Sequence, residues 1–562
     1  MAVFVALEGG HGEPLHRQLY AAVRHAILAG NWRPGSRVPS TRLLAEQLDV
    51  SRNTVMNAFE ELLAEGYLVG RVGSGTYVAT DLPEPSLQVS GRAAPARGRS
   101  GGTRSTDAGR KQDGVEAEDV PGAVPTQARG TRTAGGRPSG GGSGAGAPGC
   151  VEGDGGQRNA GRAEGAEAAP GEARTLGDMV SARGTRLTAT PSPFLPPMPA
   201  SLGMAFRPGT PAIDRFPIDV WGQLLARRWA RSARSLLERI DVQGYGPLRQ
   251  AVADYVTTAR GVRCSVDQVI LVGGTQQALT LTAQVLLDPG DAVWVEDPGY
   301  LGARGALVAA SASLVPVPVD AEGIDVAAGI AARPDARLAV VTAAHQFPLG
   351  GSLSAARREA LLTWARKHDA WVFEDDYDSE FRYTGRPLPA LQGMDAEDRV
   401  IYAGTFSKVL SSSLRLAYLV VPRALLPTFL SAKAFADVQS PTLEQAVLSD
   451  FITEGHFARH IRRMRVLYAR RQKVLLQCAA RELDGLLDVR PEPAGMHLLG
   501  WLPPGRDEDE IAARAWARGL VVLPLSMFRI ASRGPGALVL GYAAVPEAEI
   551  VEGVRTLREA LR

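Results

Sequence analysis

Three stretches near the start of the chain carry apolar residues at helical spacing. Residues 14–30, 41–48 and 51–66 each repeat an apolar residue every three or four positions, which predicts three helices. The segment that follows, YLVGRVGSGTYVA, alternates apolar and polar residues around a Gly-rich tip, which predicts a β-hairpin. The pattern therefore predicts a small α+β domain over residues 1–80.

A different pattern fills residues 199–562. Short apolar runs typical of strands alternate there with helical stretches, and this alternation indicates βαβ units around a mainly parallel sheet. The strand-like runs are 269–274, 292–297, 338–344, 370–376 and 400–405. We therefore predict a large α/β domain.

Residues 81–198, between these two regions, show neither the helical spacing nor the strand-like runs of apolar residues. No Phe, Trp or Tyr occurs between Tyr77 and Phe194, and 24 of the 62 Gly fall in residues 82–195. So little apolar surface cannot offset the entropy of ordering the chain. The sequence therefore predicts two domains joined by a long disordered linker.

Composition excludes several classes of protein. In 562 residues no uncharged apolar run approaches the roughly 18–20 residues of a membrane span, and the start lacks the pattern of a signal peptide. Three Cys are too few and too scattered for a disulfide framework or a zinc site. We expect a cytoplasmic protein with no membrane contact. The net charge of +2 does not decide on DNA binding, because that depends on a local patch.

The second and third predicted helices are joined by a four-residue turn, as in a helix-turn-helix motif. The second helix of such a motif presents its first residues to the major groove; here they are Ser51, Arg52, Asn53 and Thr54. Arg can bind a guanine edge, Asn an adenine edge, and Ser or Thr a phosphate. The alternative is a solvated helical hairpin, since residues 1–80 carry seven basic and seven acidic side chains.

The segment RPGSRVPSTRLLAEQLDVSRNTVMNAFEELLAEGYLVGRVGSGTYV resembles the winged helix of GntR-type bacterial regulators almost end to end. Ser40 or Thr41 caps the first helix of the motif, and Ser40 is also a candidate for contact with DNA. The resemblance implies binding to double-stranded operator DNA. It places the DNA contacts at Arg37, Arg42, Ser51, Arg52, Thr54, Arg71 and Gly73.

Polar residues follow the predicted strands at their carboxyl ends, where open α/β sheets build binding sites. Gly273, Gly274, Thr275 and Gln276 lie between a strand and the start of a helix, where backbone N–H groups can hold a phosphate. Such a turn can also serve only to connect two elements. It is not a P-loop, because no GK[ST] follows.

Asp375 and Tyr377 stand at the end of another predicted strand. A carboxylate there can keep a pyridine nitrogen protonated, and a phenol can hydrogen-bond an oxygen on the same ring. The alternatives are a Mg²⁺ site or a solvated acidic loop, because several carboxylates crowd together. No His lies within the cluster, which argues against a transition metal.

Lys408 lies three residues after Thr405 and seven before Arg415. An amine in a polar pocket near Arg can have its pKa lowered and form a Schiff base, while Thr405, Ser407 and Arg415 would hold a phosphate. Without the other motifs, a single Lys in a Ser-rich loop would be interpreted as a surface residue. The three motifs in this order favour one cofactor site.

The segments EDPGY, HQFPLGG, EDDYDSEFRY, GTFSKVL, EGHFARHIRRMR and AGMHLLGWL resemble the MocR (GabR-like) branch of the GntR regulators. That branch joins this winged helix to a class I aminotransferase-like domain of pyridoxal-phosphate (PLP) fold type I. The resemblance covers residues 5–80 and 200–562. It implies that Lys408 forms the aldimine with PLP, that Asp375 contacts the pyridine nitrogen and that Tyr377 contacts the 3-oxygen. It also implies Tyr300 on the ring face, with the phosphate held by Gly274, Thr275, Gln276, Thr405 and Arg415.

Two positions depart from the aminotransferase pattern. Phe347, beside His345 and Gln346, stands where these enzymes usually have the Asn that contacts the 3-oxygen. Val539 or a neighbour stands where they usually have the Arg that binds the substrate carboxylate, with Arg529 and Arg533 nearby. Efficient transamination is therefore not expected, and the chain is compatible with an effector that lacks a carboxylate.

These observations predict a PLP-dependent transcription regulator that senses an amine, an amino acid or PLP itself. The resemblance also implies a homodimer. The alternatives are an active aminotransferase with a DNA-binding domain and a vestigial fold without cofactor. No metal is expected.

Overall fold

The computed structural model describes residues 15–28, 31–48, 50–71, 75–80, 180–192, 205–238, 241–385 and 387–562. The predicted α+β domain has helices α1 (Leu15–Leu28), α2 (Thr41–Leu48) and α3 (Arg52–Ala64), and strands β1 (Leu68–Arg71) and β2 (Gly75–Val78). The two strands pair antiparallel. The apolar faces of the three helices meet in one core, in which Leu19, Val23, Val55 and Leu62 are fully buried. The predicted winged helix-turn-helix is confirmed.

An eight-stranded sheet forms the centre of the large domain, in the order β3-β10-β9-β8-β7-β4-β5-β6. Its strands are β3 (Val269–Val272), β4 (Ala292–Asp297), β5 (Ser313–Asp320), β6 (Gly323–Ile324), β7 (Leu338–Val341), β8 (Trp371–Asp376), β9 (Val400–Thr405) and β10 (Ala417–Val420). Across the sheet, the adjacent strands β9, β8, β7, β4 and β5 are parallel to one another. Strands β10 and β6 run antiparallel to their neighbours. The predicted α/β domain with a mainly parallel sheet is confirmed.

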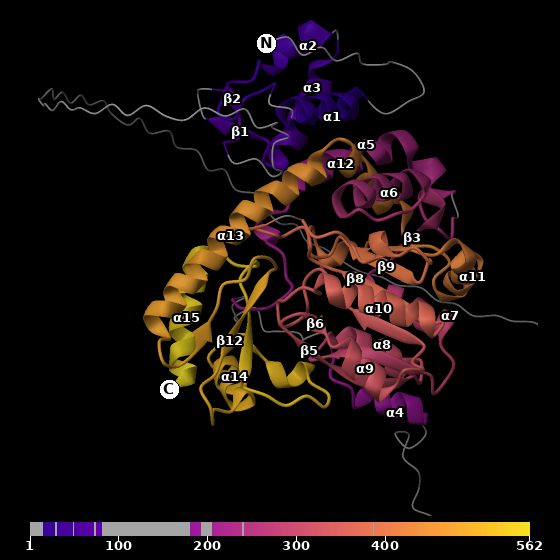
Figure 1. The fold of residues 1–562 in the computed structure, drawn as a ribbon, viewed down its shortest axis with the longest axis vertical. Helices are drawn as coiled ribbons and strands as arrows, with labels where there is room; N and C mark the ends of the chain where they lie inside the picture. Colours follow the sequence, from indigo (N-terminus) through magenta and orange to yellow (C-terminus); the bar gives the residue numbers. More distant parts are fainter. Residues whose placement is uncertain are drawn as a thin grey trace, which may run out of the picture. The chain divides into compact units, whose positions relative to one another are not determined.

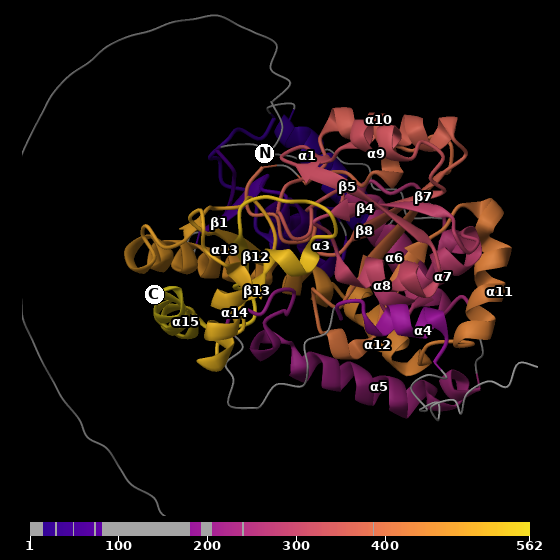
Figure 2. The same ribbon diagram turned by 90° about the horizontal axis from the view of Figure 1, so that it is seen from below.

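Helices cover both faces of this sheet (Figures 1 and 2). One layer holds α7 (Thr275–Leu286), α8 (Leu301–Ala309) and α11 (Leu426–Ala436), and the other holds α9 (Val326–Ala332) and α10 (Ala355–Lys367). Successive side chains of a strand point to opposite faces. Val293 of β4 therefore packs in the first layer and Trp294 in the second, where its ring stacks on Trp364 with centroids 3.8 Å apart.

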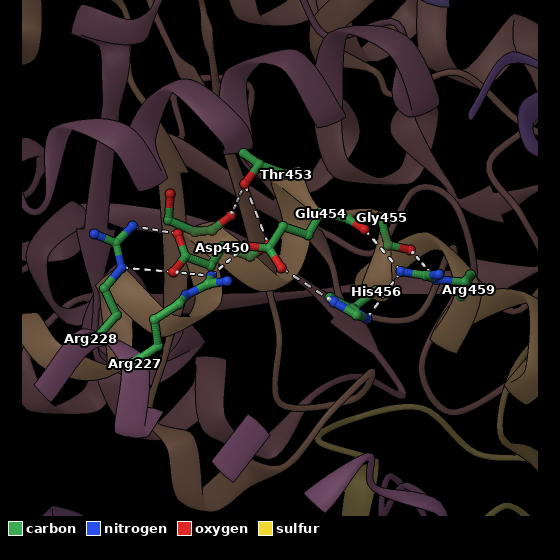
Figure 3. Close-up of polar contacts among 9 residues, drawn as sticks. Arg227, Arg228, Asp450, Thr453, Glu454, Gly455, His456 and Arg459 are labelled. Carbon is green, nitrogen blue, oxygen red and sulfur yellow. Dashed lines mark hydrogen bonds and ion pairs between the residues drawn. The ribbon is translucent and has the colours of Figure 1, made fainter. Parts of the chain in front are cut away.

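Three more helices cover the sheet near β3 and β10, namely α5 (Ile218–Leu237), α6 (Gly246–Arg260) and α12 (Thr442–Thr453). A cluster of charges fixes α5 against α12 (Figure 3). Arg228 Nε donates to Asp450 Oδ2 at 2.7 Å, and Arg227 Nη2 donates to the same oxygen at 2.8 Å. Arg227 also pairs with Glu454. Burial opposes the charge on Asp450, but the two guanidinium groups hold the pKa of this carboxyl below its usual value.

The long helix α13 (His456–Glu482) leads from α12 to a second, antiparallel sheet (Figure 1). This sheet has the order β11-β12-β14-β13, with β11 (Asp488–Val489), β12 (His497–Trp501), β13 (Leu523–Pro524) and β14 (Ala537–Gly541). Helices α14 (Glu508–Ala517) and α15 (Glu547–Leu561) pack with it. β14 matters for the site, because it ends beside the segment that enters the large domain.

Most of the predicted linker, residues 81–198, lies outside the described residues. Residues 180–192 are described, and they contain helix α4 (Ala182–Thr188), whose N-cap Ser181 accepts a hydrogen bond from Gly184 N. The prediction of disorder is therefore wrong for this short stretch, because local capping and contact with α8 stabilise a turn of helix that composition alone does not reveal. None of the helices in the described ranges combines the length and apolar character that crossing a membrane requires.

Candidate functional site

The ten residues that the sequence predicts for a cofactor site line one cavity of about 240 Å³ in the large domain. They come from the carboxyl ends of β3, β4, β8 and β9 and from the segments that follow these strands. The ten are Gly274, Thr275, Gln276, Tyr300, Asp375, Tyr377, Thr405, Ser407, Lys408 and Arg415. The topology therefore brings together motifs that are far apart in the sequence, as expected for the carboxyl edge of a parallel sheet.

Lys408 lies just after β9 and points into the cavity. Its Nζ donates a hydrogen bond to the carbonyl oxygen of Gly209 at 2.9 Å. Burial lowers the pKa of Lys408, Asp375 and Asp378 act in the opposite direction, and the positive charge of Arg207 lowers it further. A larger fraction of this amine is therefore neutral and nucleophilic than in an exposed lysine.

Asp375 lies near the end of β8 and is almost fully buried. Burial, and after it the charge of Asp376, raise the pKa of Asp375 to about 7. Its Oδ1 has no hydrogen-bond partner within the described part of the chain. A buried carboxyl oxygen without a partner is costly, so this oxygen fits a ligand that brings an N–H group or a positive charge.

Tyr377 follows β8 and shares a partner with the next residue. Its hydroxyl lies 2.9 Å from Nδ1 of His345, and Asp378 Oδ2 lies 3.0 Å from the same nitrogen. Burial alone would lower the pKa of His345, but Asp378 raises it above its usual value. Burial also raises the pKa of Tyr377 well above its usual value, so its hydroxyl keeps its proton.

The part of the cavity that Gly274 and Arg415 line is suited to an anion. Gly274 precedes α7, has a φ of +138°, and would bring an added Cβ to 2.9 Å from Arg415 Nη2. Only glycine therefore fits against this guanidinium. Thr405 Oγ1 accepts a hydrogen bond from Ser407 N at 3.2 Å, and Gln276 Nε2 donates to Gly302 O at 3.0 Å. The N-terminus of α7 and Arg415 both favour a phosphate here.

Aromatic side chains also line the cavity. Phe347 packs edge-on against Tyr300, Tyr377, His497 and Phe528, with ring centroids 5.2–6.3 Å apart. Phe347, at the position where aminotransferases of this fold usually have Asn, thus packs and cannot donate a hydrogen bond. Next to Phe347, the hydroxyl of Tyr377 lines the cavity and keeps a proton that it can donate.

Neither cationic candidate near the C-terminus lines the cavity. Arg529 donates to Pro535 O at 2.6 Å and lies 3.5 Å from Glu508 Oε1. Val539 is fully buried in the apolar core of the second sheet. Arg207 does line the cavity, and sequence reasoning missed it because a single Arg in the turn FRPG belongs to no recognisable pattern.

The described part of the winged helix shows Ser40, one of the two residues predicted to cap the first helix of the motif, as its cap, and Ser51 as the cap of the second. Ser40 Oγ accepts a hydrogen bond from Leu43 N at 3.2 Å, and Ser51 Oγ accepts one from Thr54 N at 3.1 Å. Thr54 also lies within hydrogen-bond distance of Ser51 through its hydroxyl, at 2.8 Å. Arg37 is exposed and lies beside Gly75, the first residue of β2 after the tip of the wing.

The remaining predicted DNA contacts lie partly outside the described residues. Arg52 and Asn53 stand on the first turn of α3, Arg42 stands on α2 and Arg71 on β1, but their side chains are not described. Gly73 lies outside the described residues altogether. The contacts of these residues with DNA stay predictions.

The cavity fits pyridoxal 5′-phosphate on three independent observations. Asp375 is a buried carboxyl with one oxygen that has no partner in the described part of the chain, and that oxygen could accept a hydrogen bond from a ring N–H. A buried amine with a lowered pKa, Lys408, lines the same cavity, and Gly274 with Arg415 forms an anion cradle there. Within the described ranges no group of His, Cys, Asp and Glu side chains could hold a metal ion.

Comparisons with known proteins divide the chain at the same places. Residues 15–78 match the bacterial regulatory proteins of the gntR family, and residues 209–557 match aminotransferase class I and II. The chain is 37% identical to the probable rhizopine catabolism regulatory protein MocR of Rhizobium meliloti, over 97% of this chain and 94% of that one. It is 30% identical to the HTH-type transcriptional regulator YdeL of Bacillus subtilis, over 97% and 96% of the two chains.

Among solved structures, the large domain is similar to LysN, the α-aminoadipate aminotransferase of Thermus thermophilus complexed with N-(5′-phosphopyridoxyl)-L-leucine. The two are 31% identical with a TM-score of 0.59, over 64% of this chain and 92% of that one. The cofactor of this fold is pyridoxal phosphate. With a GntR winged helix at one end and a class I and II aminotransferase domain at the other, the chain belongs to the MocR branch of the GntR family of transcription regulators.

Proposed function

We propose that this protein is a pyridoxal-phosphate-dependent regulator of transcription, whose large domain senses an amine, an amino acid or the cofactor itself. The observation that carries the proposal is the convergence of Lys408, the unpartnered carboxyl of Asp375 and the Arg415 cradle on one cavity, in a chain that also has a GntR winged helix. Pyridoxal 5′-phosphate, when bound, supplies an electrophilic carbonyl carbon that reacts with primary amines.

Each residue of the cavity has a task in this proposal. Lys408 presents a partly neutral amine to the carbonyl carbon, because burial lowers its pKa. Asp375 accepts a hydrogen bond from the ring nitrogen and holds a proton there. Tyr377 donates its hydroxyl proton to the ring 3-oxygen, and Tyr300 covers one face of the ring. Arg415, Thr405, Ser407 and the N-terminus of α7, with Thr275 and Gln276, hold the phosphate.

The DNA half of the proposal rests on α3. Ser51 caps this helix, so its first turn presents Arg52, Asn53 and Thr54 as a recognition helix presents its base-reading residues. Arg37, Arg42, Arg71 and Gly73 would contact phosphates or the adjoining groove. An effector that changes operator affinity tenfold needs a coupling free energy of only about 1.4 kcal/mol.

A homodimer would present two winged helices to two half-sites of an operator. Helix α5 supports this part of the proposal, because it exposes three large apolar side chains. Ile218 is 71% exposed, Trp229 56% and Leu237 73%. Exposed apolar side chains along one helix form a surface suited to association with another chain.

The visible absorbance of the protein tests the cofactor half. Wild type purified with pyridoxal 5′-phosphate should show a cofactor band that Lys408→Ala lacks, and primary amines should change that band. Sustained turnover of an amino donor with a keto acid would favour the aminotransferase alternative, which the retained Lys408, Asp375 and Tyr377 permit. A wild type without any Lys408-dependent absorbance would overturn the proposal.

A further inference from the structure

The segment that enters the large domain passes beside the cavity and carries Arg207. Phe206 forms an antiparallel bridge with Gly541, and Gly541 N donates to Phe206 O at 2.8 Å. The Phe206 side chain is fully buried, and its φ of +64° turns the chain sharply. Two residues after Arg207, the carbonyl of Gly209 accepts the hydrogen bond from Lys408. The backbone of Arg207 is therefore held on both sides, next to the reactive amine.

The guanidinium of Arg207 has no hydrogen-bond or ion-pair partner among the residues that the structure describes. The other arginine side chains near the cavity are held at other positions. Arg415 lies against Gly274 at the phosphate end, and Arg529 is held by backbone carbonyls and Glu508 outside the cavity. The charge of Arg207 also acts on Lys408, whose pKa it lowers after the larger effect of burial.

The end of β14 explains why a cation from this segment matters. Aminotransferases of this fold usually bind the substrate carboxylate with an Arg on this strand, but here Val539 is fully buried in an apolar core. Gly541, two residues further on, lies so close to the entering segment that an added Cβ would meet Arg207 O at 2.3 Å. Arg207 thus enters the cavity beside the strand that usually supplies the carboxylate-binding Arg.

We propose that Arg207 binds a carboxylate of the effector, so that the ligand sensed by this pocket is an amino acid and not a simple amine. The inference rests on the proposed function. The planar guanidinium binds a carboxylate through two parallel N–H···O hydrogen bonds, which are stronger than those between neutral groups. The amine of the same ligand lies at Lys408, close to the segment that carries Arg207. The sequence alone is compatible with an effector that lacks a carboxylate, and this proposal differs from that interpretation.

Matched pairs of ligands test the inference on the protein loaded with pyridoxal 5′-phosphate. L-Alanine and L-alaninamide, and β-alanine and β-alaninamide, differ only in whether a carboxylate or a neutral amide accompanies the amine. Dissociation constants come from the change in visible absorbance. We expect wild type to prefer the acid of at least one pair by about tenfold or more, the strength of a charge-assisted hydrogen bond. Arg207→Gln should lose that preference, and Arg207→Lys should retain part of it.

Arg215→Gln is the matched control, because Arg215 is an exposed Arg of the same segment that pairs with Asp214 and does not line the cavity. This variant should keep the wild-type preference. If Arg207→Gln also keeps it, the inference is wrong while the proposed function stands. If the protein shows no Lys408-dependent absorbance, the proposed function fails instead.

A second measurement does not depend on the cofactor. Propionate has a carboxylate and no amine, and calorimetry on the cofactor-free protein measures its binding directly. Wild type and Arg215→Gln should bind propionate about tenfold more tightly than Arg207→Gln does. Equal affinity in all three proteins, or no binding to wild type, would overturn the role of Arg207.

Discussion

The hydroxyl of Tyr377 lies 2.9 Å from Nδ1 of His345. The same nitrogen lies 3.0 Å from Asp378, whose charge raises the pKa of His345 against the effect of burial. Nδ1 of His345 therefore lies between the carboxylate of Asp378 and the hydroxyl of Tyr377, which lines the cavity. His497, which lines the cavity, is neutral, because burial and then the charge of His345 lower its pKa to about 3.

Replacing His345 by Asn should remove a contribution to stability that depends on pH in a defined direction. The pKa of His345 is higher in the folded protein than its unfolded value of about 6.5, so the stabilisation it provides is complete below pH 6.5. That stabilisation disappears as the pH rises through the folded pKa. The melting temperature of wild type minus that of His345→Asn should shrink between pH 6 and pH 9, as measured by differential scanning calorimetry on cofactor-free protein. A constant difference would show that Asp378 and Tyr377 do not depend on a charged His345.

Asp375→Asn should stabilise the cofactor-free protein and weaken its hold on the cofactor. Burial raises the folded pKa of Asp375 to about 7, so the ionised carboxyl destabilises the fold at higher pH. The cost grows from about pH 4 to pH 7 and is on the order of 2 kcal/mol or more at pH 8. Urea unfolding at pH 8 should therefore show a more stable variant, and the gain should vanish at pH 4.

In the cofactor-loaded protein, the same substitution is expected to be unfavourable, because it weakens cofactor binding. Without a carboxylate opposite the ring nitrogen, Asp375→Asn should release pyridoxal 5′-phosphate about tenfold more readily during dialysis, by loss of one charge-assisted hydrogen bond. A variant that is both less stable without cofactor and unchanged with it would contradict the role given to Asp375.

The site residues that the sequence predicts lie at the ends of strands, whereas Arg207 lies on an irregular segment. Asp375, Lys408 and Gly274 could be found from the sequence, because parallel strands end at one edge of a sheet and each strand shows as an apolar run. Arg207 could not be found in this way, because it reaches the cavity through the bridge between Phe206 and Gly541. These two residues pair in the structure but lie near opposite ends of the large domain's sequence. Irregular segments placed by such long-range pairing carry no local period.

The same reason explains His345. The sequence identifies His345 only as a neighbour of Phe347, which stands where aminotransferases usually have Asn. Its contact with Asp378 forms only when the loops after β7 and β8 meet in the folded protein. Helix α4 was missed because its seven residues carry no apolar period and bury none of their side chains.

The charge cluster between α5 and α12 should contribute measurably to stability. Asp450→Asn removes the carboxylate that Arg227 and Arg228 share, and we expect a loss of about 2 kcal/mol in the free energy of unfolding at pH 7. The folded pKa of Asp450 is lowered, so the contribution is present above pH 4 and disappears as the pH falls through the folded value. Urea unfolding followed by circular dichroism measures both effects.

Asp488→Asn is the control for this prediction. Asp488 pairs with Arg490 at 2.7 Å, but both side chains are more than half exposed. Such a pair contributes about 1 kcal/mol at most, because water screens it. Equal losses in the two variants would mean that the cluster on α12 is an ordinary surface ion pair.

The exposed face of α5 should hold the homodimer together. Trp229→Ser removes the largest exposed apolar side chain of this helix and should raise the dimer dissociation constant about tenfold or more, the effect of losing an aromatic anchor. Val466→Ser on α13, also exposed, is the control and should leave association unchanged. Sedimentation equilibrium distinguishes the two. A wild type that is monomeric, or a dimer that Trp229→Ser does not weaken, would remove α5 from the interface.

The most direct test joins the two domains in one measurement. Duplexes are selected from a random pool with the wild-type protein, and their dissociation constants are measured by fluorescence anisotropy with and without pyridoxal 5′-phosphate and then with added amino acid. We expect loading or effector binding to change the affinity of wild type about tenfold or more, and to leave that of Lys408→Ala unchanged. The same affinity in every state of wild type, or an equal shift in Lys408→Ala, would contradict the account.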